Sequence, residues 1–423
     1  MKRTLALVLT LCLCLGLLGA ASAQEKTELR IMWWGSQTRH DRTIAALELY
    51  QQQNPGITFS YEFMGSQDYW TKLSTLVASG DVPDVFQIGN NFLTYESAIE
   101  PLDSYIQSGL IDISNTNDSY LSTTRIKGVQ MGISLGVNSL ALAYDPEMFA
   151  KAGVAEPTPN WTWAEFEQAA LTIHEKLGVF GSSMFNDFFI GMVIGIPQYG
   201  TGETVYNADA TGLGYTNDKY ISDYMAMKKR LLDAGAYPTA GELAAITDVE
   251  NDFLTKGTAA MTWLHSNTAV ALMTAANRPL KLAAPPKQTA DGPSGLCIRS
   301  SQAFSIYNQS KHKEEAAKFI SWFMNSEEAN AILKGERGVP ITANVREALA
   351  ANLDASTKAT YDFISLVGAL ASNPPPLEPA AQTELEDIRK QIDEEVMFGL
   401  ITPEEGAAKF RTEAEDAFAR TAK

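Results

Sequence analysis

Cysteine is scarce in this chain. Three cysteines occur among 423 residues, and two of them, Cys12 and Cys14, lie close to the N-terminus. If the N-terminal segment is removed, Cys297 stands alone and the chain cannot form an internal disulfide. A secreted protein without disulfides depends on a large hydrophobic core. The hydrophobic content of 45% is enough to build one, and the length predicts two or three domains.

Basic residues are few relative to acidic ones. The chain has 33 Lys and Arg against 50 Asp and Glu, which gives a formal net charge of -17. A negative field of this size repels phosphate backbones and anionic membrane surfaces, so nucleic acid and lipid partners are not expected. The same field mildly disfavours polyanionic ligands.

Only the N-terminus carries a long hydrophobic run. Lys2 and Arg3 precede an apolar stretch from Leu5 to Leu18, and Ala21 and Ala23 supply the small residues of a cleavage site. The stretch is shorter than the roughly 20 residues of a transmembrane helix. We therefore expect a signal peptide over residues 1–23 and a mature protein that is secreted, periplasmic or associated with the cell surface. A lipid anchor is the alternative.

Signatures of catalysis are missing as well. The four histidines are scattered, at positions 40, 174, 265 and 312, and neither an H-E-x-x-H nor a G-x-S-x-G motif occurs. We therefore predict no catalytic residues, no metal site and no cofactor. A secreted polysaccharide hydrolase stays open as an alternative, because its two acid/base carboxylates cannot be identified from sequence.

Strand and helix patterns alternate in the N-terminal part, which predicts a parallel α/β sheet. The expected strands span 29–34, 57–63 and 82–88, and the expected helices span 40–54 and 68–79. A second unit begins with a strand at 139–144 and a helix that Thr162 and Glu165 start as a capping box. Thr402 and Glu405 predict the same kind of start for a C-terminal helix.

Four segments together resemble one protein family. They are KLSTLVASGDVPDVFQIGN (Lys72–Asn90), LALAYDPEMFAKAGV (Leu140–Val154), FLTKGTAAMTW (Phe253–Trp263) and EEAAKFISWFMNSEEA (Glu314–Ala329). In this order they resemble the family 1 extracellular solute-binding proteins, which are carbohydrate-binding components of bacterial ABC importers related to maltose-binding protein. The resemblance covers essentially the whole mature chain.

The resemblance implies a two-lobed periplasmic-binding-protein fold. Each α/β lobe would be a mostly parallel sheet flanked by helices, with hinge crossings between the lobes and a ligand cleft that closes on sugar. We expect residues 24–136 and 299–336 in the first lobe and residues 137–298 and 337–423 in the second. The expected partners are a mono- or oligosaccharide and the membrane permease subunits of an ABC importer, and the protein is expected to be a monomer.

Strand ends supply the first candidate ligand-binding residues, because ligands of open α/β sheets lie beyond the carboxyl ends of strands. Sugars need flat aromatic rings for their C–H faces and amides or charged forks for their hydroxyls. The candidates at the ends of the first and third strands are Trp34, Gln37, Arg39, His40 and Gln87. For Arg39 and His40 the alternative is a solvated helix start. Tyr69 and Trp70 are each a ring at the cleft or part of the core.

The resemblance adds further candidates. It implies a sugar-binding role for Asn90 after the third strand, for Asp187 and Phe188 in the second lobe, and for Trp263 and Asn267 around the turn that follows a later strand. That turn lacks the Gly-Pro-Trp sequence of maltose-binding relatives, which argues against maltodextrin specificity. Another small polar ligand, such as a polyamine, an amino acid or a metal ion, stays open as an alternative, because a fold does not determine its ligand.

Overall fold

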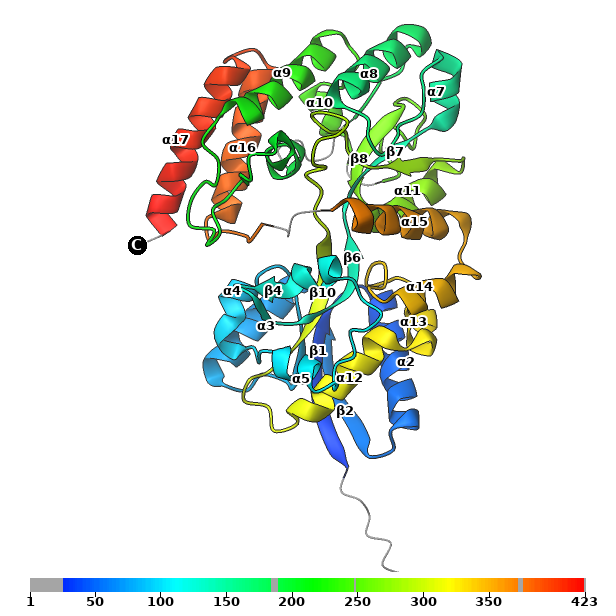
Figure 1. Ribbon diagram of the computed structural model, residues 1–423, viewed down its shortest axis with the longest axis vertical. Coiled ribbons are helices and arrows are strands. Elements are labelled where there is room, and N and C mark those ends of the chain that lie inside the picture. Colours follow the sequence, from blue (N-terminus) through cyan, green and yellow to red (C-terminus); the bar gives the residue numbers. More distant parts are fainter. Residues whose placement is uncertain (1–25, 184–188, 247–248, 372–375, 422–423) are drawn as a thin grey trace, which may run out of the picture.

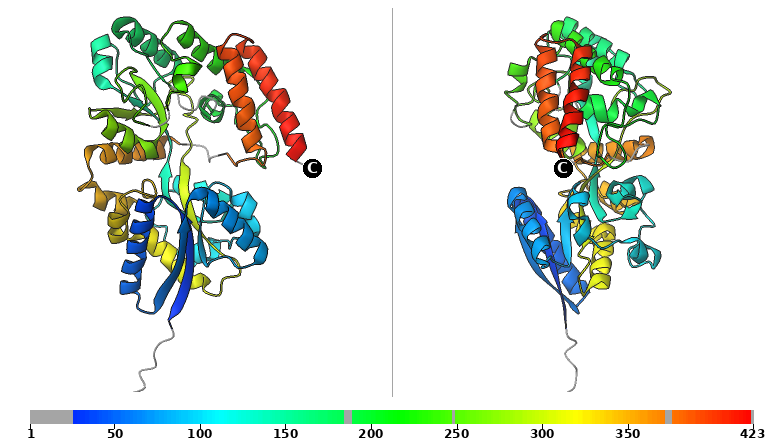
Figure 2. Two further views of the ribbon diagram at one scale, coloured as in Figure 1. Left: turned by 180° about the vertical axis from the view of Figure 1, so that it is seen from behind. Right: turned by 90° about the vertical axis from the view of Figure 1, so that its left-hand side faces the viewer.

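The computed structural model describes residues 26–183, 189–246, 249–371 and 376–421. These residues form two lobes that lie one above the other along the longest axis of the molecule (Figure 1). The N-terminal strand belongs to the first lobe, and the C-terminal helices lie on the second lobe in both further views (Figure 2). The predicted two-lobed α/β architecture is confirmed.

The first lobe is built around a five-stranded sheet with the order β2-β1-β3-β10-β6. Its strands are β1 (Thr27–Trp34), β2 (Ile57–Met64), β3 (Val85–Ile88), β6 (Ile133–Asn138) and β10 (Arg299–Ile306). β1 is parallel to β2 and β3, whereas β10 is antiparallel to β3 and β6. The sheet is therefore mixed rather than mostly parallel, because β10 enters it on its way back from the second lobe.

Alternation along β1 produces the layers of this lobe. Leu29, Ile31 and Trp33 pack on one face with α2 (Gln37–Gln53), and Met32 packs on the other face with Tyr69 and its neighbours from α3 (Ser66–Ser79). Successive strand side chains point to opposite faces, so one strand anchors helices on both. Burial of each such apolar side chain contributes about 1.5–3 kcal/mol to the free energy of unfolding.

Further first-lobe elements surround this core. They are α3 (Ser66–Ser79), α4 (Phe92–Tyr95), η1 (Glu96–Ala98), α5 (Asp103–Gln107), α6 (Asp118–Leu121), η2 (Ser122–Thr124), the ribbon of β4 (Arg125–Ile126) and β5 (Val129–Gln130), α12 (Lys313–Asn325) and α13 (Glu327–Leu333). The apolar stripe of α12 is buried, with Phe319 and Phe323 in the core, as its spacing indicates.

The second lobe has a three-stranded sheet with the order β8-β7-β9. β7 (Leu140–Tyr144) is antiparallel to both β8 (Met261–His265) and β9 (Lys281–Ala283). Isolated parallel bridges join Phe180 to Ala259 and Ser183 to Thr262. The prediction of a mostly parallel sheet is thus wrong for the three strands of this lobe. Long helical connections separate them, and such connections allow a strand to return in either direction.

Helices make up most of the second lobe. They are α7 (Pro146–Ala152), α8 (Trp163–Leu177), η3 (Phe189–Ile194), η4 (Pro197–Tyr199), α9 (Lys219–Asp233), α10 (Ala240–Leu243), α11 (Ser266–Ala276), α15 (Ala355–Leu370), α16 (Gln382–Met397) and α17 (Pro403–Thr421). The predicted capping box of α8 is present, and Thr402 and Glu405 form the corresponding pair before α17. None of the described helices combines the length and the apolarity needed to cross a membrane.

In the described part of the chain, three segments cross between the lobes. The first runs from β6 into β7 and the second leads into β10. Both pass close to residues 337–339 of the first lobe: a Cβ on Gly136 would lie 2.0 Å from the carbonyl oxygen of Arg337, and a Cβ on Gly338 would lie 2.8 Å from Ser301 Oγ. Val137 and Val339 form a bridge at this crossing. The third crossing joins α14 (Ala343–Ala350), which packs on α13 of the first lobe, to α15, which packs on α11 of the second.

The last lobe boundary therefore differs from the expected one. The N–H of Ala343 donates to the carbonyl of Asn115 in the first lobe at 2.8 Å, and α14 lies beside α13 in Figure 1. Residues 337–350 belong with the first lobe, and the chain changes lobes between α14 and α15. A helix pattern alone does not reveal this, because amphipathic helices fit either lobe equally well.

Candidate functional site

Two cavities lie between the lobes. The arginine cavity, of about 560 Å³, is lined by Asn90, Arg125 and Lys127 of the first lobe, by Tyr206 and other residues of the second lobe, and by Arg299 of the crossing. The tryptophan cavity, of about 580 Å³, is lined by first-lobe and crossing residues that include Trp34, Arg39, Asn138 and Glu336, and by second-lobe residues that include Asn267. Both volumes are typical of small-molecule sites.

The first-lobe side of this region is formed by parallel strand ends. β1 ends at Trp34 and β3 ends at Ile88, just before Gly89 and Asn90. Because β1 and β3 are parallel neighbours, their carboxyl ends reach the same edge of the sheet. The predicted position of the ligand-binding edge therefore coincides with the edge that faces the second lobe (Figure 1).

An aromatic ledge, made of Trp34 and Trp70, lies at this edge. The two rings are half-buried, with centroids 4.8 Å apart, and Trp70 stacks on Tyr95 at 5.9 Å. A Cβ on Gly89 would come within 3.7 Å of Trp70, so the small residue at the end of β3 leaves that ring uncovered. Trp33 is completely buried, in agreement with the argument that neighbouring strand residues face opposite sides.

Three of the predicted first-lobe candidates are buried in the scaffold instead. His40 accepts a hydrogen bond at Nδ1 from Trp33 Nε1 (3.1 Å) and stacks on Phe63, and burial lowers the pKa of its imidazole. The hydroxyl of Tyr69 donates to the carbonyl of Gln87. Burial removes these side chains from direct contact with a ligand, because the starts of α2 and α3, which carry them, pack onto the sheet.

Gln87, the third buried candidate, hydrogen-bonds to the backbone at the end of β1. Its Nε2 donates to the carbonyl of Trp34 (3.2 Å), and its Oε1 accepts a hydrogen bond of 2.5 Å from Arg337 Nη1. The side chain is fully buried because β3 is covered on both faces along its whole length. Its amide therefore orients the backbone that carries Trp34 rather than facing the cleft.

The predicted position of Trp263 at the turn after a strand is also wrong. It lies in the middle of β8 rather than at its end, and only 1% of its surface is exposed. Its ring stacks on Trp163 of α8 at a centroid distance of 5.8 Å and meets Phe166 edge-on. The side chain belongs to the core under α8, because β8 continues for two residues beyond it.

The remaining candidates are accessible or lie outside the description. Asn90 donates from Nδ2 to Glu378 Oε1 at 3.3 Å across the lobes, and Arg39 donates from Nη2 to the carbonyl of Glu336 at 2.9 Å. Asn267 is exposed at the start of α11. The amide of Gln37 is exposed and donates to Asp41, and the residue lines neither cavity. Asp187 and Phe188 lie outside the described residues, so their roles stay predictions.

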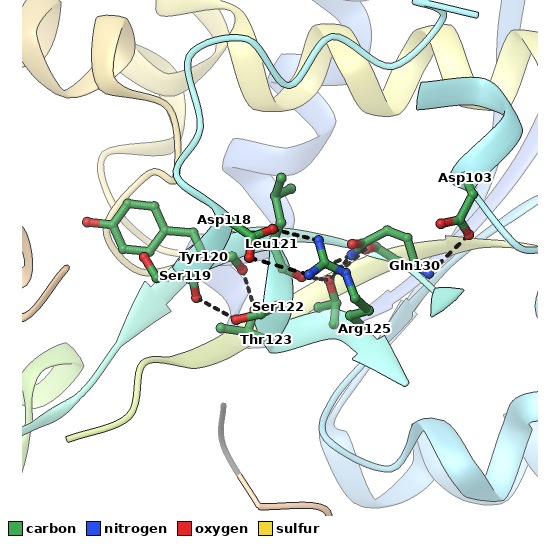
Figure 3. Close-up of polar contacts among 11 residues, drawn as sticks. Asp103, Asp118, Ser119, Tyr120, Leu121, Ser122, Thr123, Arg125 and Gln130 are labelled. Carbon is green, nitrogen blue, oxygen red and sulfur yellow. Dashed lines mark hydrogen bonds and ion pairs between the residues drawn. The ribbon is translucent and has the colours of Figure 1, made fainter. Parts of the chain in front are cut away.

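Sequence analysis missed the basic side chains of the arginine cavity. Arg125 begins β4, and its Nη2 lies 2.7 Å from Asp118 Oδ1 (Figure 3). The buried amide of Gln130 donates to the carbonyls of Leu121 and Gly132 and so holds this loop in place. Two-residue strands leave no periodic signal, and nothing in the local sequence indicates that the loop faces the second lobe.

Arg299 approaches from the lobe crossing. Its Nη1 lies 3.8 Å from Glu378 Oε1, and it adjoins His265 in a smaller hollow next to the arginine cavity. Burial, together with the positive charge of Arg299, lowers the pKa of His265 to about 4. The Pro-, Gly- and Ser-rich sequence before Gln302 indicates a crossing here, and that signal is the one that points toward Arg299.

The thiol in the arginine cavity has an ordinary structural environment. Cys297 is buried, and burial raises the pKa of its thiol above the usual value. A protonated thiol is a poor nucleophile. Within the part of the chain that the structure describes, no three His, Cys, Asp or Glu side chains gather as metal ligands.

The chain is similar to known bacterial solute-binding proteins in both sequence and structure. The family of bacterial extracellular solute-binding proteins matches residues 36–330. A family 1 extracellular solute-binding protein of Alicyclobacillus acidocaldarius has a solved structure with 28% identity, which covers 93% of this chain and 98% of its own, with a TM-score of 0.81. An oligogalacturonide-binding protein of Yersinia enterocolitica shares the fold at 22% identity, a TM-score of 0.78, and coverage of 94% of this chain and 100% of its own. A Brucella abortus protein described as a binding protein is 23% identical over 301 residues, which are 69% of this chain and 70% of that protein.

Proposed function

Because the chain belongs to the family of bacterial extracellular solute-binding proteins, we propose that it captures a saccharide between its lobes and delivers it unaltered to an ABC importer. The observation that carries the proposal is the pair of cavities between the lobes, lined by aromatic rings and polar side chains. The lining comes from both lobes and from the crossings. A ligand held there touches parts of the protein that hinge motion brings together.

The chemistry of the lining suits a sugar. The ring of Trp34, which adjoins Trp70 at a centroid distance of 4.8 Å, offers flat apolar surface for the C–H face of a pyranose in the tryptophan cavity, and Tyr206 offers a ring in the arginine cavity. The amides of Asn90, Asn138 and Asn267 both donate and accept hydrogen bonds, as sugar hydroxyls do. The Yersinia protein of the same fold binds oligogalacturonide, which supports a saccharide as the class of ligand here.

Hinge closure is the proposed mechanism of capture. Sugar first contacts the aromatic ledge and Asn90 on the first lobe, and the second lobe then closes over it. The hydrogen bond between Asn90 and Glu378 already joins the lobes in this structure, and it is replaced by ligand hydroxyls on binding. Residues 1–23 export the chain, and the closed form docks on permease subunits, with ATP hydrolysed by separate chains.

A saccharide screen tests the proposed function. Mono- and oligosaccharides are titrated into the mature chain, with thermal unfolding and calorimetry as readouts, and mass spectrometry of the recovered sugar. A binder at a hundredfold excess over its Kd stabilises the protein by about 2.7 kcal/mol. Intact sugar after incubation is expected; cleaved sugar would show an enzyme, and no shift with any saccharide would refute sugar capture.

A variant pair locates the binding surface. We expect Trp34→Ala to weaken saccharide binding about tenfold or more, since stacked aromatic anchors dominate such interfaces. Trp322→Ala is the matched control, because Trp322 is a half-buried tryptophan that packs on Tyr50, Phe319 and Phe323, away from both cavities. Equal affinity losses in the two variants would contradict the assignment of the aromatic ledge to ligand binding.

A further inference from the structure

Arg337 is a buried cation that no carboxylate neutralises. It is 2% exposed, and within the part of the chain that the structure describes it forms no ion pair. Its guanidinium lies instead over the rings of Phe304 and Phe323, with Cζ 5.1 and 5.6 Å from their centroids. Burial, and then the charge of Arg39, lower the pKa of this guanidinium. A buried charge without a counter-ion is costly, so the directed N–H bonds of Arg337 distinguish it from an apolar side chain of similar size.

Two hydrogen bonds use these N–H groups. Arg337 Nη1 donates to Gln87 Oε1 at 2.5 Å, and Nη2 donates to Thr43 Oγ1 at 2.9 Å. Gln87 in turn donates from Nε2 to the carbonyl of Trp34 at 3.2 Å. An arginine side chain has donors only and a carbonyl is an acceptor only, so an amide that joins the two has one orientation. Arg337 therefore fixes which end of the Gln87 amide faces Trp34.

The carbonyl of Trp34 receives this side-chain donor where the backbone ladder of the sheet stops. The ladder from β1 to β2 continues to Trp34, whereas the ladder from β1 to β3 ends at Met32. Beyond that point the amide of Gln87 takes the place of a backbone donor from β3. A second donor, Arg39 Nη1, is farther from the carbonyl, at 3.5 Å. Because a side chain takes its direction from the backbone that carries it, the amide also sets how the ring of Trp34 faces the tryptophan cavity.

The backbone of Arg337 is attached to two of the lobe crossings. Its carbonyl accepts a hydrogen bond from the hydroxyl of Ser301 on β10, and that hydroxyl lies 2.8 Å from the carbonyl of Gly136 on β6. Two residues further on, Val339 and Val137 exchange backbone hydrogen bonds of 3.2 and 2.9 Å. β6 and β10 are the strands that lead between the lobes (Figure 1). Arg337 thus connects the crossing strands to the end of β1.

We propose that Arg337 is a positioning residue for saccharide binding: acting through Gln87, it holds Trp34 in a fixed relation to the crossing strands, so that the ring meets the sugar in one orientation as the lobes close. This inference rests on the proposed function and adds to it two side chains that are buried away from the ligand. A purely structural role would lower affinity only in variants that also lose stability. The variants below therefore separate affinity from stability.

Gln87→Glu removes the donor to Trp34 without removing the partner of Arg337. The new carboxylate gives the buried guanidinium a counter-ion, and the guanidinium keeps it ionised and unable to donate. The midpoint of urea denaturation is expected to be no lower than that of the wild type. Calorimetry with maltotriose, cellotriose, xylotriose and trigalacturonate identifies the member of this panel that the wild type binds most tightly. Its Kd is expected to rise about fivefold or more in Gln87→Glu.

Thr43→Val is the matched control. It removes the other acceptor of Arg337 and leaves the bond from Gln87 to Trp34 in place, and Thr43 is buried outside the linings of both cavities. The midpoint of urea denaturation is expected to fall, because a buried donor loses its partner, while the Kd changes by less than about twofold. An unchanged Kd in Gln87→Glu, or an equal loss of affinity in Thr43→Val, would overturn the inference.

Two substitutions of Arg337 test its part in orienting the amide. Lysine, like arginine, has donors only, so Arg337→Lys retains the orientation of Gln87 that Arg337→Met abolishes. Each variant is titrated at a temperature at which circular dichroism shows it folded. We expect a Kd within about threefold of the wild type for Arg337→Lys and about fivefold or more higher for Arg337→Met. Equal affinities of the two variants would show that Arg337 does not act through the amide.

A double-mutant cycle with Trp34→Ala shows whether Gln87 acts through that ring. In the Trp34→Ala background, Gln87→Glu is expected to change the Kd by less than about twofold. The same loss in both backgrounds would mean that Gln87 acts by another route, and would overturn the inference. If the wild type binds a saccharide and Gln87→Glu binds it equally well, the inference fails while saccharide capture stands. If the wild type binds no member of the panel, both fail.

Discussion

The two interlobe cavities are nearly equal in volume, at about 560 and about 580 Å³, but the arginines at the two cavities have different kinds of partner. In the tryptophan cavity, Arg39 of α2 donates to the backbone of Glu336, and Arg42, which is on the same helix but not in the cavity lining, donates to the carboxylate of Glu336. These charges hold α2 to the segment that follows α13. In the arginine cavity, Arg125 is paired with a carboxylate that is mostly exposed to water. The difference indicates that the arginines at the tryptophan cavity stabilise the fold, whereas the ion pair of Arg125 at the arginine cavity can be exchanged for another partner.

The largest expected effect concerns the scaffold beneath the cleft. Trp263→Ala is expected to lower the free energy of unfolding by about 3–5 kcal/mol, because it removes a buried ring that stacks on Trp163. Chemical denaturation measures this loss. Trp34→Ala, at the cleft edge, is expected to cost less than half as much. Equal costs for the two tryptophans would remove the distinction between core and cleft.

Arg337→Ala tests the scaffold under the tryptophan cavity directly. Arg337 is 2% exposed and donates to Gln87 Oε1 and Thr43 Oγ1, at 2.5 and 2.9 Å. The substitution leaves a cavity and two unsatisfied acceptors, so a loss of about 2–4 kcal/mol in the free energy of unfolding is expected by urea denaturation. A variant as stable as the wild type would show that this buried guanidinium does not hold the loop.

The pH dependence of stability tests the surroundings of Arg299. The pKa of His265 is about 4 in the folded protein, below the usual value of 6.5. The unfolded chain therefore takes up a proton first as the pH falls, and stability drops between pH 6.5 and about 4. This group alone accounts for a loss of about 2 kcal/mol between pH 7 and pH 5. Urea unfolding of wild type and His265→Gln checks it, since the variant should lack this part of the slope.

The smallest expected effect on stability is in the arginine cavity. Arg125→Gln breaks an ion pair in which 34% of the Arg125 side chain is exposed. Such pairs contribute little, so the free energy of unfolding should change by less than about 1 kcal/mol. Denaturation at low and high salt measures this. A loss comparable to that of Arg337→Ala would mean that Arg125 belongs to the scaffold, and the contrast between the cavities would fail.

Local patterns predicted the parts of the fold that depend on neighbouring residues. The strands predicted at 29–34, 57–63 and 82–88 correspond to β1, β2 and β3, and the Thr162–Glu165 pair located the start of α8. The direction of β10 was not predictable in this way, because its pairing with β3 joins residues far apart in the chain. The position of α14 on the first lobe was not predictable for the same reason.

The candidate site shows a similar division. Trp34, predicted from the end of the first strand, and Asn90, implied by the family resemblance, both line interlobe cavities. Gln87 and Trp263 are buried instead, because burial at a strand depends on which helices cover it. Arg125 carries no local signal at all, since its place at the cleft results from the packing of a loop. Overall charge does not locate individual cations, and three of the 33 Lys and Arg residues, Arg125, Lys127 and Arg299, line one cavity.

Hydrogen–deuterium exchange tests the central claim most directly. The mature chain is measured alone and with a saturating amount of the tightest-binding saccharide of the panel. Slower exchange is expected together in residues 122–127 of the first lobe and residues 202–208 of the second, which line opposite sides of the arginine cavity. No change is expected at the far ends of the lobes. Protection of one lobe alone, or of neither, would contradict capture of a sugar between them.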